Sequence, residues 1–121
     1  MANSKVLVKN DKAIVTEWSF KVGDSTGPHK HQYNYVVVPM VDGELKIIDK
    51  ENKETISKLT KGVAYYRDKG VEHNVFNNNN FPYSFIEVEM VDLCYVRKIS
   101  LVIFIHFIIR SLLFLLGYKR F

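Results

Sequence analysis

The chain has a single cysteine, Cys94, and this shortage excludes an intramolecular disulfide. Its first residues, MANSKVLVKNDK, are polar and lack the charged-then-apolar pattern of a signal peptide. These two absences predict a protein of the reducing cytoplasm. The sequence also lacks a nucleophile elbow, a phosphate-binding glycine loop and a cysteine–histidine pair within reach, which argues against those three kinds of active site.

Acidic residues are missing from the end of the chain. Residues 1–92 contain 12 Lys and Arg against 13 Asp and Glu, whereas residues 93–121 contain 5 basic and no acidic residues. The formal net charge of +4 therefore comes entirely from the tail. The first 92 residues lack the basic surface that nucleic-acid binding needs, and no RNP-type, helix-turn-helix or zinc-finger pattern occurs. We expect no nucleic-acid partner.

A length of 121 residues, of which 47% are hydrophobic and 13% aromatic, suits one small domain with a compact core. From Lys5 to Met90 the apolar residues come in short runs rich in Val, Ile, Tyr and Phe, separated by turn residues, which predicts an all-β fold. Strands are expected near residues 4–9, 12–21, 29–38, 44–49, 53–59, 63–67, 71–77 and 83–90. So many short strands favour a β-sandwich or jelly roll over an open sheet.

Three local patterns add detail to this fold. Asp42–Gly43 is a hairpin signal, because both positions of a tight primed turn need a positive φ. The four asparagines at 77–80 tolerate left-handed backbone and predict a long turn. In the last strand Glu87 and Glu89 alternate with Ile86, Val88 and Met90, so the two glutamates are expected on the solvent face.

The composition changes after Asp92, which predicts a barrel domain at 1–92 and an apolar tail, helical in character, at 93–121. Residues 99–116 are nearly all apolar and are flanked by basic residues, a length at the lower end of a membrane span. Three interpretations stay open: a membrane anchor, a helix packed on a partner subunit, and a tail acquired by frameshift or readthrough. His106 lies in this apolar run and is not expected to be a ligand.

Three histidines form the constellation that carries chemistry. His29 and His31 stand one residue apart, and in a regular strand they would share a face with Tyr35. His73 lies in a later run and could meet them inside the sandwich. A transition metal needs such neutral imidazoles to converge on one point from a rigid barrel.

The two segments that hold these histidines resemble the two motifs of the cupin family. The first, GDSTGPHKHQYNYVVVPMVDG at 23–43, resembles the pattern of Gly, five residues and His-x-His, followed by Glu and a later Gly. The second, GVAYYRDKGVEHNVFN at 62–77, matches the other motif at Gly62, Gly70, His73 and Asn77, with Asp68 in place of its proline. The resemblance covers roughly residues 12–90. It implies a jelly-roll barrel in which His29, His31 and His73 bind a metal near the mouth.

The chain departs from the family pattern at Tyr35, which occupies the position of the usual glutamate ligand. The centre therefore looks like three histidines, with open positions for water or substrate. It suits one divalent metal among Fe, Mn, Zn, Ni and Cu, and the ligands do not choose among them. Tyr35 is the candidate catalytic residue, because it could orient a substrate or donate a proton.

Two hypotheses for the function follow from the resemblance. In the first, a small metal-binding cupin acts on or binds a small polar organic ligand; as an enzyme it would be dioxygenase-like or isomerase-like. In the second, the same barrel is a non-catalytic binding or sensing module, with or without metal. The resemblance also implies a homodimer. A membrane partner would depend on residues 99–116.

Overall fold

The computed structural model describes residues 1–91, 104–105 and 108. The chain divides into two units, Met1–Val91 and Asp92–Phe121. The second unit lies almost wholly outside the described residues, and so do the tail helix, the apolar run at 99–116 and His106. Among the residues that are described, no helix combines the length and the apolar character needed to cross a membrane.

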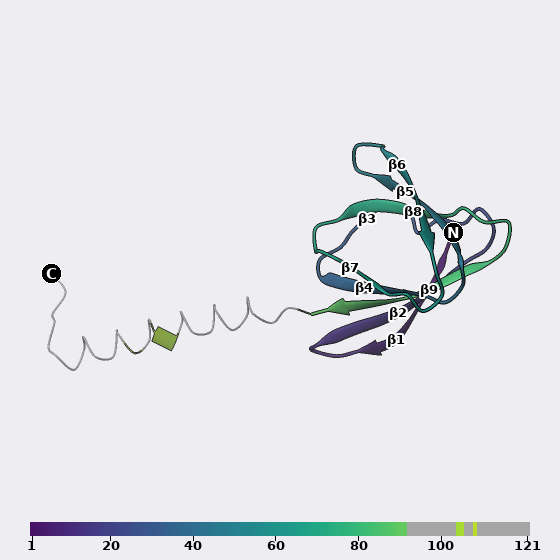
Figure 1. Cartoon of the computed structure of the whole chain (residues 1–121). Helices are drawn as coiled ribbons and strands as arrows, with labels where there is room; N and C mark the ends of the chain where they lie inside the picture. The colour runs from purple at the N-terminus through teal and green to yellow at the C-terminus, as the bar shows by residue number, and fades with distance from the viewer. Residues whose placement is uncertain (92–103, 106–107, 109–121) are drawn as a thin grey trace, which may run out of the picture. The chain divides into compact units, whose positions relative to one another are not determined.

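Nine β-strands make up the first unit (Figure 1), one more than the eight that the sequence pattern predicted. They are β1 (Asn3–Lys9), β2 (Ala13–Phe20), β3 (His29–Lys30), β4 (Asn34–Pro39), β5 (Gly43–Asp49), β6 (Glu54–Leu59), β7 (Tyr65–Arg67), β8 (Glu72–Asn77) and β9 (Tyr83–Met90). Five form one antiparallel sheet in the order β1-β2-β9-β4-β7, and four form a second in the order β3-β8-β5-β6. The prediction of an all-β jelly roll is confirmed.

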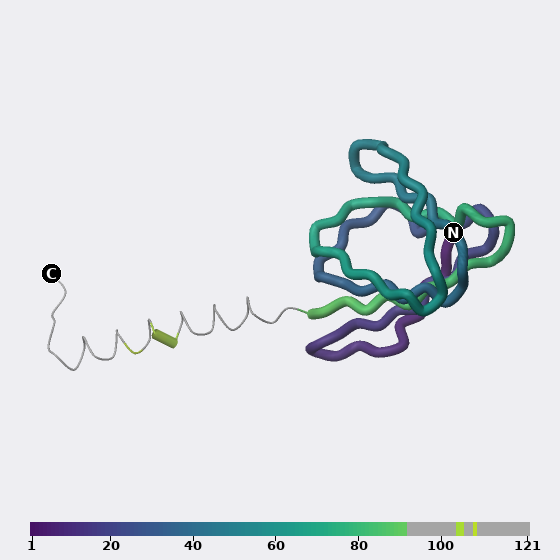
Figure 2. Tube along the Cα trace, viewed as in Figure 1, coloured from purple at the N-terminus to yellow at the C-terminus, as the bar shows by residue number. Residues whose placement is uncertain are grey.

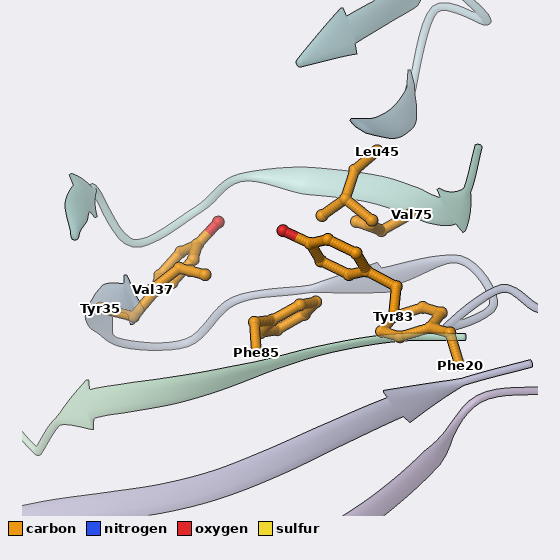
Figure 3. Close-up of a cluster of buried hydrophobic side chains, with 7 residues drawn as sticks. All are labelled: Phe20, Tyr35, Val37, Leu45, Val75, Tyr83 and Phe85. Carbon is orange, nitrogen blue, oxygen red and sulfur yellow. The ribbon is translucent and has the colours of Figure 1, made fainter. Parts of the chain in front are cut away.

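The two sheets face each other, and the chain trace in Figure 2 closes around a common interior. Seven buried side chains fill much of this interior: Phe20, Tyr35, Val37, Leu45, Val75, Tyr83 and Phe85. Figure 3 shows them meeting from both sheets. Burial of each large apolar side chain contributes roughly 1.5 to 3 kcal/mol, so these contacts hold the two sheets together.

The single strand expected at 29–38 is wrong. The segment bends at Gln32–Tyr33 and becomes two strands in different sheets, β3 in the second and β4 in the first. Two backbone hydrogen bonds hold the bend: His31 N donates to Val71 O at 2.9 Å, and Gly70 N donates to His31 O at 2.8 Å. The alternation of side chains in the sequence is the same for one continuous strand and for two strands in different sheets. The sequence therefore did not reveal the break.

The hairpin predicted at Asp42–Gly43 is also wrong. β4 and β5 belong to different sheets, and Gly43 has no positive φ. Glycine is needed there for space, because an added Cβ would lie 2.8 Å from Asn79 Oδ1 and 2.9 Å from Tyr83 Cε2.

The turn after β8 is present, and Asn77 is its buried anchor. The side-chain amide of Asn77 donates to Phe81 O at 2.8 Å and to Lys21 O at 3.1 Å. Asn79 in turn donates its backbone N–H to Asn77 Oδ1 at 3.0 Å. The asparagine run is therefore a structural element that joins β8 to β9.

Candidate metal centre

The three histidines are brought together by the second sheet and by the bend that follows β3. His29 on β3 and His73 on β8 are direct partners in the antiparallel register. His31 lies between β3 and the bend, and its backbone is tied to Gly70 and Val71 of the second motif. Each motif thus helps to position the histidines of the other.

The ring nitrogens of the three histidines converge. His31 Nε2 lies 3.1 Å from His29 Nε2 and 3.1 Å from His73 Nε2. His29 Nδ1 lies 2.9 Å from the carbonyl oxygen of Gly27, so Nδ1 carries the proton and donates it there. This tautomer leaves the Nε2 lone pair of His29 directed at the other two rings, as a metal ligand requires.

Burial keeps two of the rings neutral. His31 is 4% exposed, and its burial, reinforced by His29 and His73, lowers its pKa from 6.5 to about 3. Burial also lowers the pKa of His73 to about 4, with His29 and Arg67 acting in the same direction. Neutral imidazoles have the free lone pair that binds a metal.

The spacing of these nitrogens fits a metal ion. A metal about 2.0 to 2.1 Å from two nitrogens that are 3.1 Å apart makes an N–metal–N angle of roughly 95° to 100°. This angle lies between the 90° of an octahedron and the roughly 109° of a tetrahedron, so the donors fit either geometry. Without a cation, one of these nitrogens would carry a proton and donate it to its neighbour, because unprotonated lone pairs at this distance repel one another.

Tyr35 lies against the centre although the strand that was expected to place it there is broken. Its ring stacks on the imidazole of His31 with centroids 3.8 Å apart and an interplanar angle of 17°. It is 2% exposed, and burial, followed by the charge of Glu87, raises its pKa above the ordinary value of 10. The phenol therefore keeps its proton and is a hydrogen-bond donor rather than an anionic ligand.

Two glutamates face the interior, so the solvent face expected for them is wrong. Glu87 is 8% exposed, and Glu89 is partly buried beside it. Their oxygens and a ring nitrogen of His31 all lie within 4.8 Å of one another. Both faces of β9 carry apolar residues, so alternation alone could not show which one the opposite sheet covers. The informative signal was Phe85, a buried aromatic residue two positions before Glu87.

The surroundings of the two glutamates raise the pKa of each carboxyl group. Burial, followed by the charge of Glu89, raises the pKa of Glu87 from 4.5 to about 7. The indole N–H of Trp18 acts in the opposite direction, although it makes no hydrogen bond of acceptable geometry and its nitrogen has no other partner. Burial also raises the pKa of Glu89, against the effect of His29.

Two hollows adjoin the centre. An open cleft of about 530 Å³ reaches His29 and His73 from outside and is lined by Lys30 and Lys50. A smaller cavity of about 200 Å³ lies between the sheets and also reaches His73. Its wall is mainly apolar, with polar groups from Tyr35, Tyr65, Arg67, Asp49, Glu72 and Glu87. Figure 3 shows the hydroxyl of Tyr35 directed from β4 toward the opposite sheet.

The fold and the site together define a jelly-roll barrel with three converging histidines, and the comparisons agree with the fold. No family model matches the chain. The chain is 44% identical over 85 residues to the β-alanine degradation protein BauB of Pseudomonas aeruginosa, an alignment that covers 70% of this chain and 88% of that protein. A cupin domain from Bordetella pertussis Tohama I is also 44% identical, with a TM-score of 0.71 over 74% of this chain and 92% of that one.

More distant structures share the fold. An RmlC-like cupin with a double-stranded β-helix fold from Methanocaldococcus jannaschii has a TM-score of 0.62 at 16% identity, over 74% of this chain and 80% of that one. The chain belongs to the cupin family, as its two motifs predicted.

Proposed function

We propose that this cupin binds one divalent transition metal through His29, His31 and His73 and presents it to a small polar organic ligand. The observation that carries the proposal is the convergence of three ring nitrogens, with His31 Nε2 3.1 Å from both His29 Nε2 and His73 Nε2 and the His29 tautomer held by Gly27. Such a metal would supply Lewis-acid polarisation of a bound oxygen or activation of water. Three neutral ligands leave its double charge uncompensated, which favours an anionic substrate.

Other features of the site would give the ligand access, orient His31 and exclude water. His29 and His73 border the outer cleft, so a ligand can reach them from solvent. Tyr35 holds the ring of His31 by stacking, and its protonated hydroxyl can donate a hydrogen bond inside the barrel. The apolar walls of the inner cavity exclude water from the bound ligand.

The name of the relative BauB connects that protein with β-alanine degradation. Because this chain is 44% identical to BauB, that name supports a role for this chain in the breakdown of a small amino acid or a product derived from it. Both reaction classes expected from the sequence remain compatible: oxygen-dependent oxidation and metal-assisted proton transfer. The non-catalytic alternative is supported by Tyr35, which stands where a carboxylate ligand was expected.

Metal analysis of protein purified without chelator tests the proposal. We expect about one metal per chain, lost in His29→Ala and in His73→Ala. His106→Ala is the matched control, since it removes the remaining histidine of the sequence, and it should retain the metal. Metal retained by the double variant of His29 and His73 would refute the ligand assignment. Oxygen uptake or product formation with small carboxylates would then separate an enzyme from a binding module.

A further inference from the structure

Glu87 occupies an unusual place for a carboxylate. It belongs to β9, pairs with Val37 of β4 in the register, and lines the inner cavity together with Val75 of the opposite sheet. More than nine-tenths of its surface is buried. The three-histidine centre does not account for this residue.

No partner compensates the charge of Glu87 among the described residues. No Lys, Arg or His nitrogen of residues 1–91 forms an ion pair with its oxygens. The indole N–H of Trp18 acts on Glu87 without a hydrogen bond of good geometry. Glu89 adds a second carboxylate nearby. Arg67 borders the same cavity, but its guanidinium donates to Tyr66 O and lies over the ring of Tyr65. A buried carboxylate without an ion-pair partner is costly, so it either keeps its proton or faces a cation, and the cavity beside Glu87 has room for a cationic group.

The cavity limits the size of that cation. Its volume of about 200 Å³ corresponds to roughly six or seven water-sized groups, at about 30 Å³ each. A molecule with about that number of non-hydrogen atoms would fill it. The cavity also reaches His73, and Glu87 lies close to His31. A molecule with two or three carbon atoms between its charged ends could therefore reach both Glu87 and the histidine centre.

We propose that the inner cavity binds a short aminocarboxylate, with its ammonium group on Glu87 and its carboxylate on the metal held by the three histidines. This inference rests on the function proposed above, because the metal provides one of the two anchors. Glu87 is then the residue that determines specificity, since it distinguishes an amino acid from the same acid without its amine. Glu89 strengthens the negative potential around the ammonium group.

Ligand binding to the full chain loaded with Co²⁺ tests the inference. Three probes are titrated while the visible spectrum of the metal is followed: β-alanine, propionate without the amine, and n-propylamine without the carboxylate. The Co²⁺ affinity of each variant is measured separately by competition with a chelator. Glu87→Gln removes the charge with little change of shape. Glu17→Gln is the matched control, since Glu17 lies on the neighbouring strand β2 and pairs with Ile86 on the outward face.

We expect wild-type protein to bind β-alanine at least tenfold more tightly than either of the other probes. Glu87→Gln should weaken β-alanine binding at least tenfold and leave propionate binding and Co²⁺ affinity within twofold, and Glu17→Gln should change nothing. Equal affinity for β-alanine and propionate would overturn the inference alone. A tenfold loss of Co²⁺ affinity in Glu87→Gln would also overturn it, because the carboxylate would then belong to the metal. Wild-type protein that binds no Co²⁺ would overturn the proposed function and this inference with it.

Discussion

Replacement of Glu87 by glutamine should stabilise the metal-free protein at alkaline pH. The pKa of Glu87 is 4.5 in the unfolded chain and about 7 in the folded protein, so the unfolded state releases the proton first as the pH rises. Stability is therefore lost between pH 4.5 and 7. Each tenfold difference in proton affinity between the two states is equivalent to about 1.4 kcal/mol, so the full loss above pH 7 is about 3 kcal/mol. Glutamine cannot ionise and avoids this loss.

Urea unfolding in chelator-treated buffer, followed by the fluorescence of Trp18, measures this effect. Between pH 5 and pH 8 the advantage of Glu87→Gln over wild type should grow by about 2 kcal/mol. Glu17→Gln, on the outward face of β2, is the matched control. An advantage of Glu87→Gln that is the same at both pH values would refute the conclusion that Glu87 is buried without compensation.

Three further changes test the surroundings of the site. Gly43→Ala should destabilise the protein by about 1 to 3 kcal/mol in urea unfolding, because the new Cβ would lie 2.8 Å from Asn79 Oδ1; an unchanged midpoint would contradict the tight packing. Tyr35→Phe keeps the ring on His31 and should leave metal affinity within about threefold, whereas Tyr35→Ala should cost about 3 to 5 kcal/mol of stability. Zn²⁺ at 100 times its dissociation constant should stabilise wild type by about 2.7 kcal/mol and should not stabilise His73→Ala; equal stabilisation of both would exclude His73 as a ligand.

The histidine cluster was accessible from the sequence because its members are fixed by two motifs rather than by one strand. The spacing of His29, His31 and His73 was informative even though the strand that was to align His29 with His31 bends. Tyr35 lies beside His31 as predicted, but it does so from β4 in the other sheet and not from the strand that was expected to hold both residues.

Glu87 was not accessible in the same way. Alternation places residues on two faces but does not say which face is covered, and that choice depends on the opposite sheet. The prediction of a hairpin at Asp42–Gly43 was wrong for a related reason. A two-residue turn signal does not show to which sheet the next strand belongs. Both errors arise from contacts between residues distant in sequence, which local patterns do not contain.

The short pairing of β3 with β8 has a consequence for how this corner of the barrel opens. Only His29 with His73 and Lys30 with Glu72 are paired there, before the chain crosses to the other sheet. An element held by so few backbone pairs has little local stability of its own. A metal on the three histidines would cross-link segments 42 residues apart, between His31 and His73. Occupancy of the metal site and the local stability of β3 would then be coupled. Release of the ion would be easiest when β3 separates from β8.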